Sequence, residues 1–92
     1  MIKPISVKPL SKYRLEITFS DGTNGVVGLE HLSGKGIFKQ WDENNLFKKV
    51  TIDAETDAIV WNEFIDIDPL NLYLKIKGIT FEQYQLRSHA TN

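Results

Sequence analysis

The clearest pattern of hydrophobic and polar positions lies in residues 12–20, where the two kinds of side chain alternate strictly. The apolar positions are Tyr13, Leu15, Ile17 and Phe19. Because successive side chains of a β-strand point to opposite faces, this segment predicts a strand with one buried face. A shorter alternation at residues 5–7, bounded by prolines, predicts a strand before it.

The motif Ser20-Asp21-Gly22 predicts a tight turn into a third strand. The hydrophobic pattern decides how long its loop is. A two-residue loop would place Val27 on the solvent-exposed face of the sheet, whereas a three-residue loop sets Leu15 opposite Val27. We therefore predict a type I turn in which Gly22 adopts the left-handed conformation and forms a bulge.

The alternation ends after the third strand, and residues 33–36 form a glycine-containing connector. The apolar positions that follow have the spacing of one helix face: Ile37, Phe38 and Trp41. A short helix is therefore predicted here. Asp42 either ends this helix or caps a further turn that brings Leu46 and Phe47 inward.

Residues 48–61 predict a second hairpin. Val50 and Ile52 resume the alternation, residues 54–57 have turn composition, and residues 59–61 are apolar again.

Residues 67–78 carry the start and stop signals of a helix. Asp68 suits the N-cap, Pro69 suits the first helical position, and Gly78 suits the left-handed C-terminal cap.

A capping box of Thr80 and Gln83 predicts a helical tail over residues 79–88, running to about Arg87 before Ser88–Asn92 fray. Together these elements predict one α+β domain over residues 1–92. It consists of a small antiparallel sheet built from two hairpin units, with two or three short helices packed against it (β-β-β-α-β-β-α-α).

The composition is that of an ordinary folded domain: 92 residues, 41% hydrophobic and 25% charged. The absence of cysteine excludes disulfides, thiolate zinc sites and a cysteine nucleophile. The chain has no apolar run of membrane-spanning length and no signal-peptide core, so we expect a cytoplasmic protein that makes no membrane contact.

Charge is unevenly distributed along the chain. Residues 50–74 contain no Lys or Arg but hold six acidic side chains: Asp53, Glu55, Asp57, Glu63, Asp66 and Asp68. The basic side chains Lys12 and Arg14 lie on the polar face of the second strand, but the sequence pI near 6.1 opposes direct nucleic-acid binding.

Candidate chemistry is sparse. No set of nucleophile, base and orienting group is visible, so we expect no enzyme activity, no cofactor and no metal. The alternative is a small metal-dependent enzyme or small-ligand binder that uses the carboxylates of Asp66 and Asp68. Trp41 and Trp61 are in register with apolar neighbours, which favours burial, although Trp61 ends a strand just before an acidic loop where an indole could anchor a partner.

A longer series of motifs carries a resemblance over residues 5–74: Tyr13-x-Leu15, Phe19-Ser20-Asp21-Gly22, Gly36-x-Phe38, Phe47, and Trp61 followed by Asp66, Pro69, Leu72 and Tyr73. This series resembles the bacterial domain of unknown function 2442 family. Many relatives have Pro-Asn-Gly or a similar sequence after the tryptophan, where this chain has Asn62-Glu63-Phe64.

The resemblance implies a small α+β fold with helices packed on an antiparallel sheet, and no established activity, catalytic residue or cofactor. Some relatives carry a C-terminal helix-turn-helix domain, which the eighteen residues after Leu74 are too few to form. Others are short stand-alone proteins encoded beside another small protein, an arrangement similar to toxin–antitoxin pairs.

We therefore expect a non-enzymatic protein-interaction module, the acidic member of a toxin–antitoxin-like or regulatory pair. Its protein partner would be encoded by a neighbouring gene, and a homodimer formed through an exposed sheet edge is a second form of the same hypothesis. The expected contact residues are Trp61, Glu63, Asp66 and Tyr73.

Overall fold

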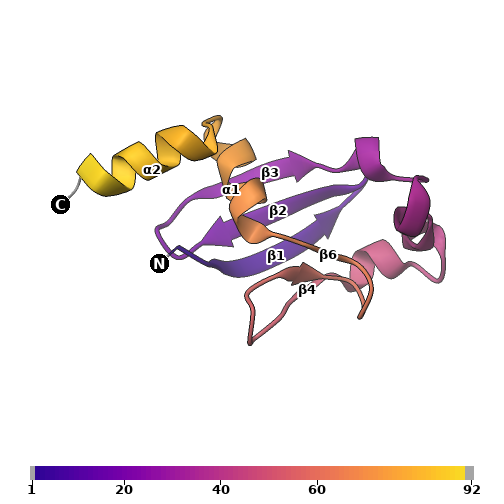
Figure 1. The fold of residues 1–92 in the computed structure, drawn as a ribbon. Helices are drawn as coiled ribbons and strands as arrows, with labels where there is room; N and C mark the ends of the chain where they lie inside the picture. The colour runs from indigo at the N-terminus through magenta and orange to yellow at the C-terminus, as the bar shows by residue number, and fades with distance from the viewer. Residues whose placement is uncertain (1, 91–92) are drawn as a thin grey trace.

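The computed structural model describes residues 2–90, which form two small antiparallel sheets and a set of short helices (Figure 1). The strands are β1 (Pro4–Leu10), β2 (Arg14–Phe19), β3 (Asn24–Gly28), β4 (Thr51–Ile52), β5 (Ile59–Val60) and β6 (Asp66–Ile67). The helices are the 3-10 helices η1 (Glu30–Leu32), η2 (Gly36–Asp42) and η3 (Leu46–Lys49), and the α-helices α1 (Pro69–Lys77) and α2 (Phe81–Ala90). The predicted α+β class is confirmed. The strands, however, form two sheets rather than one.

Sheet A has the strand order β1-β2-β3, and its turn has the predicted form. Leu15 pairs with Val27. The N–H of Phe19 donates to the carbonyl of Thr23 over 2.8 Å, which closes a three-residue loop, and Gly22 has a φ of 88°. The bulged turn inferred from the hydrophobic pattern is therefore confirmed.

The apolar face of β2 forms the centre of the core. Leu15 and Ile17 are fully buried and Phe19 is 1% exposed. Burial of each such side chain contributes about 1.5–3 kcal/mol before chain entropy is subtracted. The opposite face of sheet A carries the polar residues of β2 and is the more exposed of the two.

The segment after sheet A differs from its prediction in helix type. Residues 36–42 form the 3-10 helix η2, which has three residues per turn. This period aligns Phe38 with Trp41, whose ring centroids lie 4.8 Å apart, and turns Ile37 outward to 41% exposure. The expectation that Ile37 shares the buried face was therefore wrong.

Asp42 ends η2, and the next turn begins at Asn45, which has a φ of 58°. Asp42 therefore stops a helix rather than capping the next one. Phe47 of η3 is buried and Leu46 is half-buried against the core, as predicted.

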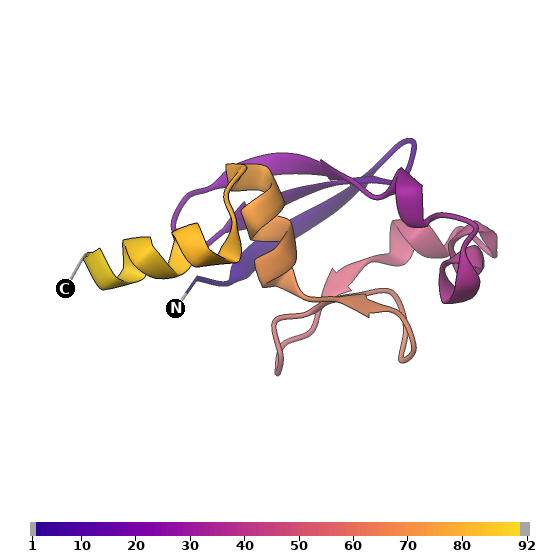
Figure 2. The same ribbon diagram turned by 45° about the horizontal axis from the view of Figure 1, so that its top comes forward.

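Sheet B contains the predicted second hairpin and one further strand. Its order is β4-β5-β6, with Ile52 opposite Ile59 and Ile59 opposite Ile67. Sheet B lies beside β1 of sheet A, as Figures 1 and 2 show.

Helix α1 has the predicted caps. The side chain of Asp68 accepts a hydrogen bond of 2.9 Å from the N–H of Leu70, and Gly78 is left-handed with a φ of 69°. The helix crosses the buried face of sheet A (Figure 2), where Ile76 packs over Gly25. This packing closes the core.

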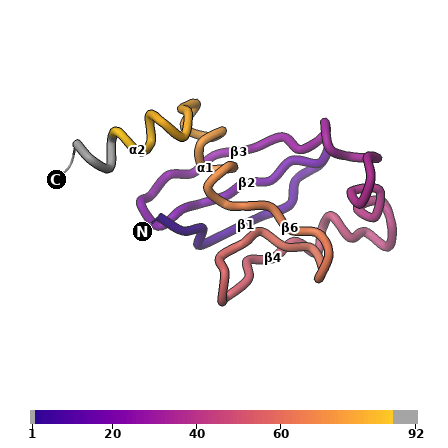
Figure 3. The backbone as a smooth tube through the Cα atoms, viewed as in Figure 1, coloured from indigo at the N-terminus to yellow at the C-terminus, as the bar shows by residue number. Residues whose placement is uncertain are grey.

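Helix α2 begins with the predicted capping box: Thr80 N–H donates to Gln83 Oε1 over 2.9 Å, and Gln83 N–H donates to Thr80 Oγ1 over 3.1 Å. It projects away from both sheets (Figure 3) and continues to Ala90, beyond the predicted end near Arg87. Residues 88–90 are helical and residues 91 and 92 lie outside the described range, so the expected fraying stays a prediction. No helix within residues 2–90 has the length and apolar character needed to cross a membrane.

Candidate functional site

Two segments far apart in the sequence meet at one end of the molecule. One is η2 with η3, and the other is the turn that joins β5 to β6, which we call the Phe64 turn (residues 61–65). Asn62 Nδ2 donates to Gln40 Oε1 over 3.2 Å and links the two segments. Trp61 Nε1 donates to the carbonyl of Phe47 over 3.1 Å and makes a second link, buried beneath the first.

The Phe64 turn is held by the backbone and by one amide side chain. The N–H of Trp61 donates to the carbonyl of Ile65 over 3.0 Å, and Asn62 Oδ1 accepts from the N–H groups of Phe64 and Ile65, each over 2.9 Å. Residues 62–64 all have negative φ, so this turn needs no glycine. The Asn62 side chain thus supplies the closure of the turn.

With the turn closed in this way, some of its side chains are buried and others are exposed. Trp61 and Ile65 are 6% and 1% exposed and point into the core, whereas Phe64 is 66% exposed. Glu63 and Asp66, on either side of Phe64 in the sequence, are also exposed. An apolar ring flanked by carboxylates is therefore fixed on the surface.

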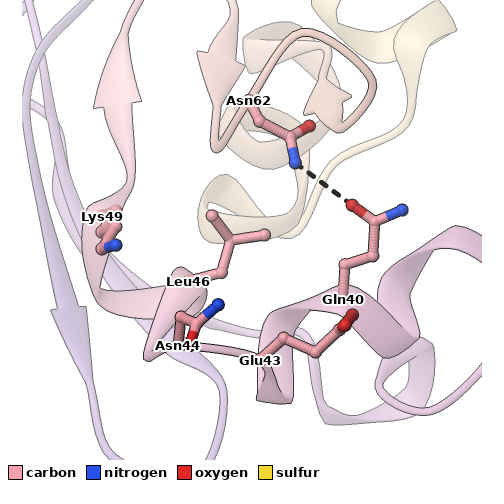
Figure 4. Close-up of a pocket in the computed structure, with 6 residues that line it drawn as sticks. All are labelled: Gln40, Glu43, Asn44, Leu46, Lys49 and Asn62. Atoms are coloured by element: carbon pink, nitrogen blue, oxygen red, sulfur yellow. Dashed lines mark hydrogen bonds between the residues drawn. The ribbon is translucent and has the colours of Figure 1, made fainter.

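Beside the turn is an open hollow of about 260 Å³, drawn in Figure 4. The amides of Asn62 and Gln40 face each other across one side of it, and Leu46 also lines it. Glu43 and Lys49 bring one charge of each sign to its rim. The hollow therefore offers polar hydrogen-bonding groups beside the turn that carries Phe64.

Two of the four predicted contact residues are not on the surface. Trp61 is buried against the aromatic cluster of η2 and η3, with its ring centroid 5.0 Å from that of Trp41. Tyr73 is 5% exposed, and its ring packs on Phe19 at 5.0 Å. Both rings are therefore buried, as the apolar neighbours of Trp61 favoured for that residue, and neither is presented to a partner, whereas Glu63 and Asp66 are exposed.

The acidic stretch is divided by the topology of sheet B. Successive turns of an antiparallel sheet lie at opposite ends, so the carboxylates of residues 53–57 are separated from Glu63. Asp53 closes its own turn by accepting from Thr56 Oγ1 over 2.8 Å, and Asp68 caps α1. Glu63 and Asp66 are therefore the acidic side chains that accompany Phe64.

The alternative hypothesis was a metal or ligand site formed by Asp66 and Asp68. The two carboxylates do not line the same hollow. Asp68 and Asp57 line a hollow of about 330 Å³ with Ile2, Leu70 and Tyr84, but Asp66 is not among its lining residues. Within residues 2–90, no three His, Cys, Asp or Glu side chains come together to hold a metal ion. In this hollow Asp68 is therefore joined by Asp57 and not by Asp66.

A third hollow, of about 340 Å³, lies on the other side of η2 and η3 and is lined by Tyr13, Trp41, Asp42 and Lys48, among others. The hydroxyl of Tyr13 donates to Asp42 Oδ1. This hydrogen bond, together with burial, raises the pKa of Tyr13. The contact ties the turn between β1 and β2 to η2, which is a structural role.

Sequence reasoning missed Phe64, although the necessary signal was present. Trp61 and Ile65 are both apolar and both face the core, and the same parity argument that resolved the first turn would have placed three residues between them. Phe64 would then fall in the loop rather than in a strand.

Comparison with known families gives one result. The family model described as "Protein of unknown function (DUF2442)" matches residues 4–78, which include both sheets and α1. Neither the curated proteins nor the solved structures contain a match.

Proposed function

The chain belongs to the DUF2442 family, and on that premise we propose that it is a non-enzymatic protein-interaction module whose contact surface is the Phe64 turn. Its partner is a protein with a basic surface, in a regulatory pair of the toxin–antitoxin type. The proposal concerns a partner other than a second copy of the chain.

One observation carries the proposal: Phe64 is two-thirds exposed, while Trp61 and Ile65 of the same turn are buried. Large apolar side chains at the centre of an interface supply much of its binding free energy. Because the Asn62 side chain already fixes the turn, little conformational entropy is lost when a partner covers Phe64. The ring is therefore pre-organised for contact.

The carboxylates of Glu63 and Asp66 indicate the chemistry of the partner. Charges at the rim of an interface accelerate association with an oppositely charged surface, and salt weakens this effect. A partner that presents Lys or Arg around an apolar pocket would complement both the ring and its acidic neighbours.

The test begins with affinity purification from the native host and identification of co-purified proteins by mass spectrometry. The binding constant is then measured for the purified pair with wild type and with Phe64→Ala. We expect Phe64→Ala to weaken binding by roughly 30-fold or more, the effect of losing a central apolar contact of about 2 kcal/mol. Leu86→Ala is the matched control, because Leu86 is equally apolar and 69% exposed but lies on α2. Equal loss in both variants, or loss in neither, would contradict the proposal.

The charge component has its own test. The double variant Glu63→Gln, Asp66→Asn should slow association with the same partner and flatten its dependence on salt. Glu55→Gln, an exposed acidic residue in the β4–β5 turn, is the control and should leave both unchanged.

A further inference from the structure

Within residues 2–90, the backbone groups at alternate residues of the outer edge of β3 have no hydrogen-bond partner. Tyr13 pairs with Leu29 and Phe19 with Thr23 through backbone hydrogen bonds, so the hydrogen-bonded pairs between them are Leu15 with Val27 and Ile17 with Gly25. The N–H and C=O groups of the intervening residues point away from β2. These residues are Asn24, Val26 and Gly28, and all three are exposed.

The two edges of sheet A differ in their protection against pairing. Strand β1 contains Pro4, Pro9 and Lys8 and a register shift between Pro4 and Ser6, and sheet B lies beside it. Prolines, charges and bulges are the usual devices that prevent edge strands from pairing with other chains. Strand β3 (Asn-Gly-Val-Val-Gly) has no charge and no proline, and its pairing with β2 is in regular register.

The unpaired groups of β3 are complementary to themselves. In an antiparallel pair of two β3 strands related by a two-fold axis at Val26, each Val26 faces its counterpart and Asn24 faces Gly28 of the other copy. All three outward residues then fall at hydrogen-bonded positions, so every outward N–H and C=O of both strands finds a partner. A strand centred on any inward residue would leave some of them unpaired.

From this edge we propose that the chain forms a symmetric homodimer through β3, joining two copies of sheet A into one six-stranded sheet. The occupant is a second copy of this chain, because the edge satisfies its own hydrogen bonds and β3 itself carries no charged side chain. Val26 is 52% exposed, and directly opposed β-branched side chains stabilise an antiparallel pair. The proposal does not depend on the Phe64 turn.

The experiment uses a pair of charge variants at the two-fold axis. Sedimentation equilibrium of wild type should show a monomer–dimer equilibrium, and Val26→Lys or Val26→Glu alone should weaken dimerisation by about tenfold or more, since like charges would be directly opposed. An equimolar mixture of the two variants should restore dimerisation, because Lys then faces Glu. Native mass spectrometry distinguishes the mixed dimer by mass.

Ile5→Lys and Ile5→Glu are the matched controls, because Ile5 is 58% exposed on β1; they should dimerise as wild type does. Circular dichroism checks that each variant folds. Amide exchange of the wild type gives a readout without any substitution: the N–H of Val26 should exchange more slowly as protein concentration rises.

A wild type that stays monomeric at all concentrations would overturn the proposal. So would a dimer that Val26→Lys leaves intact, or single variants that fail to recover on mixing. Phe64→Ala should leave the dimer unchanged. The proposal of a homodimer and the proposal of a partner-binding surface at the Phe64 turn can therefore be refuted independently of each other.

Discussion

The hydroxyl of Tyr73 donates a hydrogen bond of 2.7 Å to Asp21 Oδ2, which joins α1 to the β2–β3 turn across 52 residues of sequence. Asp21 Oδ1 accepts a second hydrogen bond, of 2.9 Å, from the N–H of Thr23 within the turn. One carboxylate therefore shapes the turn and anchors the helix that covers the sheet.

Removal of the Tyr73 hydroxyl tests this anchor. Tyr73→Phe keeps the ring that packs on Phe19 but loses the hydrogen bond to Asp21, so we expect the free energy of unfolding to fall by about 0.5–1.5 kcal/mol. Urea denaturation measures the change. In a double-mutant cycle with Asp21→Asn, the two effects should not add; strictly additive effects would show that the contact contributes nothing in solution.

Acid stability should depend on Asp21. The backbone N–H of Thr23 and the hydroxyl of Tyr73 hold the pKa of Asp21 below its usual value of 3.8. Since the folded state binds this proton less readily than the unfolded state, the contribution is present above the unfolded pKa and is lost as pH falls through the lower folded pKa. Between about pH 5 and pH 2, Asp21→Asn should therefore lose stability less steeply than wild type. If the urea midpoints of Asp21→Asn and wild type fall in parallel across that range, the lowered pKa of Asp21 is not a source of the acid dependence.

Gly25 is required by the packing of α1. A Cβ at this position would lie 2.5 Å from Ile76 Cγ2, so Gly25→Ala should destabilise the fold by about 1–3 kcal/mol. The added substitution Ile76→Ala should recover part of that loss by removing the clash. Gly28→Ala is the control on the same strand, because nothing lies within 4 Å of its Cβ. Equal thermal midpoints for Gly25→Ala and Gly28→Ala would contradict the packing.

The two aspartates before α1 should behave differently. Asp68→Ala removes the N-cap and should cost about 1 kcal/mol, whereas Asp66→Ala, two residues earlier on an exposed position of β6, should cost little. Thermal unfolding by circular dichroism distinguishes them. If both variants melt alike, the cap is not the source of the stability that Asp68 supplies.

The family assignment and the α+β class followed from the order of motifs along the chain, and both are confirmed. The residues of the candidate site were predicted less accurately from the sequence than the fold was. Glu63 and Asp66 are exposed, and their contact with a partner stays a prediction; the exposed aromatic residue between them in the sequence is Phe64, whereas Trp61 and Tyr73 are buried.

The sequence by itself determined the features that depend on neighbouring residues. The bulged turn at Gly22 follows from the parity of Leu15 and Val27, and the ends of α1 follow from Asp68 and Gly78, because these signals act within a few residues. The tertiary structure alone decided that Phe64 is exposed while Tyr73 is buried, that η2 is a 3-10 helix, and that β6 completes a separate sheet. Those outcomes depend on packing between distant segments, such as the burial of Trp61 against Phe47, and no local pattern records such contacts.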